Sequence, residues 1–131
     1  MPEKDLAQTA RASSRRLSGL RAEEAVAQRL AGEGYAILDR NFSVPRIGEL
    51  DIVAFRENGV HIIEVRARRQ GSRFGTGAES ITAAKIRRIR NTASIYLARN
   101  QLMNNDVYLL AADVALDTHG NVVSIRMIPM Q

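Results

Sequence analysis

The spacing of hydrophobic positions changes along the chain, and each change marks a new predicted element. From about Leu17 to Glu33 the apolar residues recur every three or four positions, which is the period of an amphipathic helix, and two glycines give a stop. A second helical period follows Thr82, a suitable N-cap, and ends near Asn100. The pattern therefore predicts two helices, each with one apolar face.

Short apolar runs between and after these helices are typical of β-strands. Asn58-Gly59 separates two of the runs, and this dipeptide favours a two-residue type I′ hairpin loop, because both loop positions need positive φ. We expect the element order α-β-β-β-α-β-β, with strands at 35–42, 48–55, 60–66, 107–116 and 122–128.

This order of elements predicts an α/β fold with a central mixed β-sheet flanked by helices. A strand, a helix and a further strand usually form a right-handed parallel unit, so 107–116 should run parallel to 60–66. The opening segment 1–16 is polar and has no sustained apolar period, which predicts a mobile basic arm. Residues 17–131 are then expected to form a single domain.

Composition narrows the cellular context. Of 131 residues, 45% are hydrophobic, which is enough for one core, and there is no cysteine for a disulfide or a thiolate metal site. No apolar run approaches the roughly 20 residues that cross a bilayer, and the opening segment lacks the apolar stretch of a secretory signal. We therefore expect a cytoplasmic protein with no membrane partner.

Positive charge is concentrated in the middle of the chain. The net charge is +5. The segment 64–99 is rich in lysine and arginine, and its only acids are Glu64 and Glu79. Such a segment favours polyanionic partners, although a solvated helix face that keeps the protein soluble is an equally good explanation for its helical part. The bases are Arg66, Arg68, Arg69, Arg73, Lys85, Arg87, Arg88, Arg90 and Arg99.

Three acidic residues stand at positions where the pattern predicts apolar side chains. Glu23 falls inside the apolar stripe of the first helix, and Asp51 and Glu64 lie on apolar strands. With a loop at Asn58-Gly59, paired positions sum to 117, so Asp51 would face Arg66 and Val53 would face Glu64. Asp51 and Glu64 would then be diagonal neighbours with Cβ atoms less than roughly 8 Å apart.

Two interpretations of these acids remain open. A cross-strand pair of Asp51 with Arg66 would satisfy one carboxylate structurally. The addition of Glu64 on the same face and Glu23 on the helix favours a Mg²⁺ site instead, because hard cations prefer carboxylate oxygens.

The motifs together resemble a known family. Gly48-Glu49-Leu50-Asp51-Ile52-Val53-Ala54, Glu64-Val65-Arg66 and Arg68, with Gly19, Glu23, Gly34-Tyr35 and Lys85 around them, are similar to the YraN-like family of small bacterial proteins. The match runs from about Leu17 to Leu116. That family is similar in fold to the PD-(D/E)XK nucleases, which include restriction enzymes and Holliday-junction resolvases, so the resemblance implies a restriction-endonuclease-like fold.

The resemblance also implies an activity and its residues. Glu23, Asp51 and Glu64 would bind Mg²⁺ or Mn²⁺, and Arg66 would complete the catalytic set of a nuclease that hydrolyses phosphodiester bonds of DNA, branched or structured DNA included. Because the end of one strand and the start of the second helix flank this site, we expect Arg68, Arg69 and Lys85 to contact phosphates. A homodimer is the oligomeric state that a two-fold symmetric substrate would favour.

One position departs from the nuclease pattern. Arg66 stands where such enzymes carry lysine, and a guanidinium keeps its proton at any working pH, so Arg66 can stabilise negative charge but cannot act as a base. The alternative hypothesis is therefore a non-catalytic nucleic-acid-binding or protein-interaction module on a degenerate nuclease fold.

Overall fold

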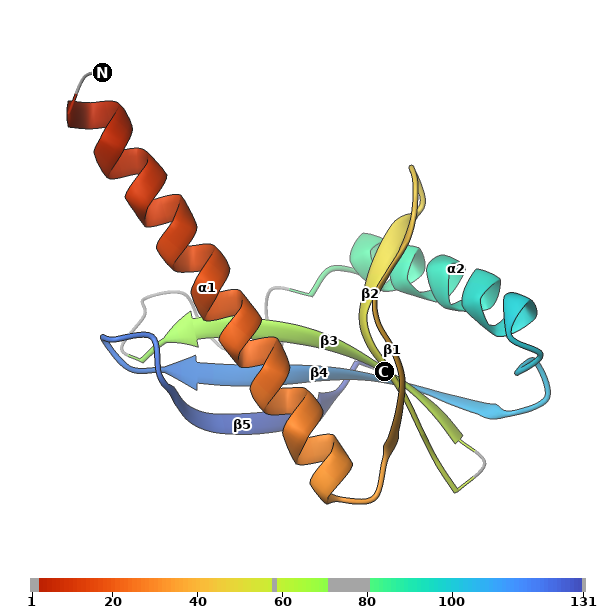
Figure 1. The fold of residues 1–131 in the computed structure, drawn as a ribbon. Coiled ribbons are helices and arrows are strands. Elements are labelled where there is room, and N and C mark those ends of the chain that lie inside the picture. Colours follow the sequence, from red (N-terminus) through yellow and green to blue (C-terminus); the bar gives the residue numbers. More distant parts are fainter. Residues whose placement is uncertain (1–2, 58, 71–80, 131) are drawn as a thin grey trace.

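In Figure 1, which shows a computed structural model, a five-stranded sheet lies between two helices. The structure describes residues 3–57, 59–70 and 81–130, with side chains from residue 16 onward. The predicted order α-β-β-β-α-β-β is confirmed, as α1 Glu3–Gly32, β1 Ala36–Val44, β2 Gly48–Arg56, β3 Gly59–Arg69, α2 Ala83–Arg99, β4 Asp106–Leu116 and β5 Val122–Pro129.

The sheet is mixed, as the sequence predicts. Its strands lie side by side in chain order, β1-β2-β3-β4-β5. β3 and β4 are parallel, and the other three neighbouring pairs are antiparallel. A parallel pair needs a long crossover, and α2 supplies it between β3 and β4.

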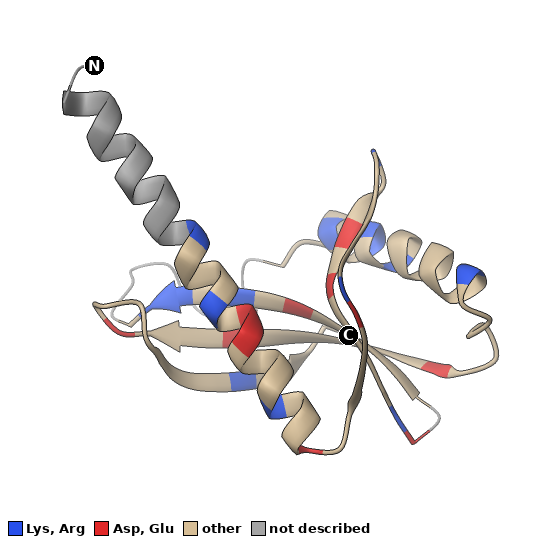
Figure 2. Cartoon of the chain, viewed as in Figure 1, with Lys and Arg blue, Asp and Glu red and all other residues tan. Residues whose placement is uncertain are grey.

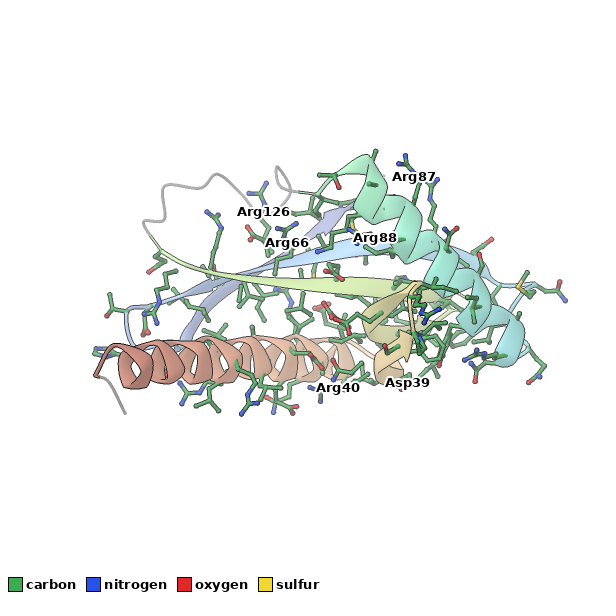
Figure 3. The ribbon with its side chains drawn as sticks, turned by 90° about the horizontal axis from the view of Figure 1, so that it is seen from above. Asp39, Arg40, Arg66, Arg87, Arg88 and Arg126 are labelled. Atoms are coloured by element: carbon green, nitrogen blue, oxygen red, sulfur yellow. The ribbon has the colours of Figure 1, made fainter. Side chains whose placement is uncertain are left out.

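α1 covers one face of the sheet (Figure 3). Val26 and Leu30, one helical turn apart, belong to a buried cluster with Ile52 of β2, Ile63 of β3 and Val114 of β4. Full burial of each such side chain contributes about 1.5–3 kcal/mol, so this cluster fixes the helix on the sheet. No helix within the described ranges combines the length and apolarity that a membrane crossing requires.

α2 covers the opposite face. Thr82 has an extended backbone, and its hydroxyl accepts a hydrogen bond from the Lys85 backbone N–H at 3.1 Å, which confirms the predicted N-cap. Ile89 and Tyr96 of α2 are buried in one cluster with Ile62 of β3. Alternate residues of the central strands thus serve two separate cores.

The first helix is longer than its apolar pattern predicts. α1 begins at Glu3, so residues 3–16, which we assigned to a mobile basic arm over 1–16, continue the helix backbone. Polar residues such as those before Leu17 can extend a helix whose apolar later turns are already anchored, because each added residue gains one backbone hydrogen bond.

The β2–β3 hairpin differs from the prediction in its turn. Arg56 pairs with Gly59, so the two-residue loop is 57–58 rather than Asn58-Gly59. Asn58 itself lies outside the described residues. Glu57 adopts φ 54°, the positive value that such a loop needs.

The shifted turn changes every pairing that the sequence predicted for this hairpin. Val53 pairs with Ile62 and not with Glu64, and paired positions sum to 115 instead of 117. Asp51 consequently does not face Arg66, and the expected cross-strand pair is wrong.

Gly59 is needed here for space rather than for its backbone freedom. A Cβ atom at Gly59 would lie 2.8 Å from Cε2 of Tyr108, which packs over it from β4. Real Cβ atoms do not tolerate such a distance, so the ring requires glycine at the first position of β3.

Gly48 lets the start of β2 approach α2 closely. A Cβ atom on Gly48 would lie 2.6 Å from the hydroxyl oxygen of Thr92, which is fully buried and donates to the Arg88 carbonyl at 2.7 Å. The helix therefore fixes the position of the β1–β2 turn.

We predict that Gly48→Ala lowers the free energy of unfolding by about 1–3 kcal/mol, the usual cost of overpacking, in chemical denaturation. Gly19→Ala is the control, because a Cβ at this helical position meets nothing within 4 Å, and it should raise stability by about 0.5–1 kcal/mol. Thr92→Ala combined with Gly48→Ala should recover part of the loss; a double variant no better than the sum of the single changes would contradict this account.

Candidate functional site

A fork between β2 and β3 forms the centre of the candidate site. Pairing of these strands ends at Ile52 and Ile63, while the first half of β2 stays paired with β1 and bends toward α2 (Figure 1). Asp51 is the first residue beyond the last pair. Its Oδ2 atom accepts a hydrogen bond from the Val65 backbone N–H at 2.8 Å, so a side chain replaces the next bond of the ladder.

Asp51 and Glu64 are close enough to share a proton. The pKa of Asp51 is raised from its ordinary value of 3.8 to about 7, mainly by burial and in addition by the charge of Glu64 and a side-chain hydrogen bond with Glu64. The Val65 N–H opposes this shift, and Glu23 adds a smaller charge effect in the same direction as Glu64. The expected meeting of Asp51 and Glu64 thus occurs, because the observed register, in which paired positions sum to 115, brings position 51 level with position 64 just beyond the last pair.

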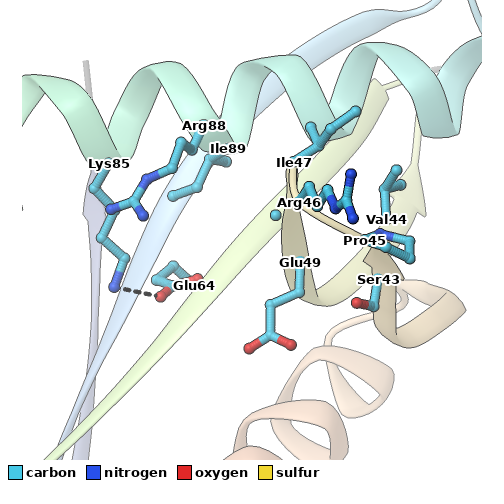
Figure 4. Close-up of a pocket in the computed structure, with 11 residues that line it drawn as sticks. Ser43, Val44, Pro45, Arg46, Ile47, Glu49, Glu64, Lys85, Arg88 and Ile89 are labelled. Atoms are coloured by element: carbon cyan, nitrogen blue, oxygen red, sulfur yellow. Dashed lines mark ion pairs between the residues drawn. The ribbon is translucent and has the colours of Figure 1, made fainter.

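Glu64 is paired with a lysine from the opposite layer. Nζ of Lys85, in the first turn of α2, lies 2.8 Å from Oε1 of Glu64, whose side chain is 14% exposed (Figure 4). We expected Lys85 to contact phosphate from the edge of the site. The structure places it against an acid within the site.

Glu23 lies on the α1 side of the fork and has its own partners. Its Oε1 atom accepts from Arg40 Nε at 3.2 Å and from Asn41 Nδ2 at 3.0 Å, both on β1. Arg40 also binds Glu24 at 2.7 Å. These contacts explain how an acid that is only 8% exposed is accommodated on the apolar side of α1.

The three acids do not form a common ligand cage. Across the described ranges, no group of three histidine or acidic side chains lies close enough to hold a metal ion. The structure brings Asp51 and Glu64 together and leaves Glu23 across the fork with Arg40.

Two hollows flank the fork, one toward each helix. A cleft of about 610 Å³ lies between α2 and the β1–β2 turn, with Glu49 and Glu64 on opposite walls (Figure 4). A smaller hollow of about 340 Å³ on the α1 side is lined by Glu23, Asp51 and again Glu49. Glu49 therefore belongs to the site although the sequence did not single it out; its spacing of two residues from Asp51 was the available signal.

The arginines at the end of β3 contact β4 and the turn that follows it. Arg66 lies level with Asp113, and its Nη1 atom is buried without a hydrogen-bond partner. Nε and Nη2 of Arg68 are 3.4 Å from the Asp113 oxygens, and Nη1 of Arg69 donates to the Thr118 carbonyl at 2.6 Å. Arg68 and Arg69, which we expected to bind phosphate, thus have protein partners.

Comparison with known families agrees with the motifs at the fork. A model of the uncharacterised protein family UPF0102 matches residues 22–116, a range that contains Glu23, Asp51, Glu64 and Lys85. The chain belongs to this family. The YraN-like resemblance of the motifs is thereby confirmed at the level of the family.

Members of UPF0102 from several bacteria align over most of their length. The chain is 37% identical over 115 residues to a UPF0102 protein of Moorella thermoacetica, covering 88% of this chain and 94% of the relative. It is 37% identical over 99 residues to one of Clostridium novyi, covering 76% and 81%. A third, from Symbiobacterium thermophilum, is 47% identical over 87 residues, covering 66% and 70%.

The raised pKa of Asp51 predicts a pH-dependent stability. Between about pH 4 and pH 7 the carboxyl ionises in the unfolded chain but keeps its proton in the folded one, so the folded state loses stability as the pH rises through this window. Asp51→Asn removes this loss and keeps an acceptor for Val65. In metal-free buffer the variant should melt about 5 °C or more above the native protein at pH 8, with a smaller difference at pH 5.

Asp106→Asn is the matched control, because Asp106 is an exposed aspartate at the start of β4. Its melting temperature should differ from the native value by the same small amount at both pH values. An Asp51→Asn effect that does not change between pH 5 and pH 8 would show that Asp51 is not held in its protonated form.

Proposed function

We propose that this UPF0102 protein is a metal-dependent nuclease with a restriction-endonuclease-like fold, acting on phosphodiester bonds of DNA at the fork between β2 and β3. The observation that carries the proposal is the acid pair Asp51–Glu64, half-buried beside a cleft with Lys85 and Arg88 on its wall. Two carboxylates in contact, with cations close by, suit a substrate that carries negative charge and a reaction that develops more of it.

The donor atoms of the acid pair fit a hard divalent cation. Oδ2 of Asp51 accepts from the Val65 N–H and Oε1 of Glu64 contacts Lys85, so a cation that replaces the proton between the two acids could bind their other oxygens. A cation between them would relieve the repulsion that raises the pKa of Asp51. Mg²⁺ and Mn²⁺ prefer such oxygens and keep several waters, so two protein carboxylates suffice.

A bound divalent cation would supply Lewis-acid activation of water and offset charge on the phosphate. Glu23 and Glu49, on the walls of the two hollows, are then placed to hold water at the edge of the site. Lys85 orients Glu64 through its 2.8 Å contact and adds a positive charge that can stabilise the transition state.

The position of Lys85 bears on the missing lysine of the nuclease pattern. Arg66 lies on β3 two residues beyond Glu64, level with Asp113 of β4, whereas the ammonium group of Lys85 reaches the acid pair. An ammonium is a compact point charge, whereas the planar guanidinium needs more room. Lys85 is therefore the lysine that we assign to this site.

Arg66 supports a second candidate function, that of a nucleic-acid-binding module without turnover. The arginine replaces the lysine of the motif, and a guanidinium binds phosphate in a bidentate manner but does not serve as a base. The two functions share the basic surface and differ in whether the acid pair binds a cation.

Cation binding gives the first test. At a concentration about 100-fold above the dissociation constant, Mg²⁺ or Mn²⁺ should stabilise the native protein by about 2–3 kcal/mol, seen as a higher melting temperature at pH 8. The shift should shrink below pH 6, because protons compete for Asp51. Asp51→Asn should abolish it and Asp106→Asn should retain it; an equal shift in both variants would remove Asp51 from the metal site.

DNA cleavage gives the second test. Linear, nicked and branched DNA are incubated with the protein and Mn²⁺, and products are resolved on gels. We expect cleavage that Asp51→Ala lowers on the order of 100-fold, because loss of cation binding removes several kcal/mol of transition-state stabilisation. Lys85→Met should lower it too, while Arg90→Met on the exposed side of α2 should not.

Cleavage that equals the Asp51→Ala background would refute the nuclease proposal for these substrates. In that case Arg66→Lys distinguishes the two candidate functions. If this change creates cleavage, the natural protein is a binding module on a scaffold otherwise competent for hydrolysis.

A further inference from the structure

A row of three charged residues crosses the sheet beside the fork. Arg66 of β3 is level with Asp113 of β4, and Asp113 is directly opposite Arg126 of β5. Adjacent strands are about 4.8 Å apart, so the Cα atoms of the two arginines are about 10 Å apart with the acid between them. Arg126 lies on the last strand and was not a candidate from sequence.

The acid in the middle of this row does not satisfy both neighbours. Asp113 is 7% exposed and its two oxygens accept from Arg68, at 3.4 Å each. Nη1 of Arg66 is buried and has no hydrogen-bond partner, and a buried donor left without an acceptor costs about 1–3 kcal/mol. The row therefore contains one guanidinium N–H group that lacks an acceptor, and an anion seated beside it would supply one.

The row is continuous with the proposed active site. Glu64 and Arg66 point to the same face of β3, two residues or about 7 Å apart, and α2 covers that face only up to Glu64 and Lys85. Figure 3 shows Arg66, Arg88 and Arg126 on the α2 side of the sheet. Figure 2 shows where basic residues lie along the ribbon: at the end of β3, on β5 and at the start of α2.

We infer that Arg66 and Arg126 form a phosphate subsite that holds the nucleic-acid backbone next to the phosphate at Asp51 and Glu64. The inference rests on the proposed function for the identity of the neighbouring phosphate. Planar guanidinium groups bind phosphate oxygens in pairs, so two arginines about 10 Å apart at the Cα atoms can converge on one phosphate between them. The negative charge of Asp113 offsets part of the positive charge of the row. Its oxygens accept from Arg68, so they do not occupy the subsite.

This assignment gives Arg66 a binding role. Lysine at the same place would present a single point charge. The planar guanidinium of arginine can bind phosphate along one edge and leave another edge for a neighbouring group. The departure from the nuclease motif then changes how the substrate is positioned, while Lys85 remains at the acid pair.

The test is the salt dependence of DNA binding, measured in EDTA so that no cleavage occurs. A fluorescein-labelled duplex is titrated with native protein, Arg66→Gln, Arg126→Gln and the double variant, and fluorescence anisotropy is followed from about 50 to about 200 mM KCl. Because the two arginines share one phosphate, the double variant should lower the slope of log K against log[salt] by about 0.9, and each single change should lower it by up to that amount.

Arg90→Gln on α2 is the control for net charge, because Arg90 is exposed and faces away from the sheet core. Its slope should change by much less than that of either subsite variant. Equal slopes for Arg90→Gln and Arg126→Gln would overturn the subsite, as would absence of DNA binding by the native protein at the lowest salt. Arg126 is also exposed, so Arg126→Gln tests the idea even if Arg66→Gln lowers the melting temperature.

A second arm separates a backbone phosphate from a free one. A labelled mononucleotide should bind far more weakly than the duplex and should respond little to the two changes. Loss of mononucleotide affinity equal to the loss for DNA would overturn the assignment to a polynucleotide. If the variants lower the slope but the native protein never cleaves DNA, the subsite is supported and only the nuclease proposal is refuted. If the native protein cleaves DNA but the variants leave the slope unchanged, the nuclease proposal is supported and the subsite is refuted.

Discussion

The early separation of β2 from β3 is the constraint on which the site depends. After the pair Ile52–Ile63 the strands diverge, and the Asp51 carboxylate takes the Val65 N–H that a continuing strand would have used. A continued ladder would have paired Asp51 directly with Glu64, since these positions also sum to 115. The fork instead opens the sheet between them, so that Asp51 lines the hollow toward α1 and Glu64 lines the cleft toward α2.

Both helices are needed to hold this opening. α2 contacts the start of β2 where Gly48 leaves no side chain, and its first turn supplies Lys85 to Glu64. α1 supplies Glu23, which Arg40 and Asn41 of β1 hold on the other side. The acid pair therefore lies where the sheet meets both helix layers. Its burial lowers the stability of the fold at neutral pH, and a bound cation would recover that free energy.

Local signals in the sequence predicted the elements, and contacts between distant segments decided the rest. The Thr82 cap and the helical and strand periods gave the element order and the parallel pair. The turn lies one residue earlier than the Asn-Gly signal indicates, so that Gly59 pairs with Arg56 and lies close to the ring of Tyr108, far along the chain. Lys85 lies in the crossover helix α2 and Glu64 on the strand before it, and no spacing rule of the sequence indicates that the two side chains meet.

The same distinction separates the candidate residues. Glu49 could have been found, since it precedes Asp51 by one strand period and shares its side of β2. Arg126 could not, because only the β4–β5 register brings it level with Asp113 and so with Arg66. A motif examined one strand at a time assigns Arg66 to the catalytic position of a missing lysine. The sheet places Arg66 in a row with Asp113 and Arg126, and in our proposal its permanently charged, planar group holds a phosphate there and does not move a proton.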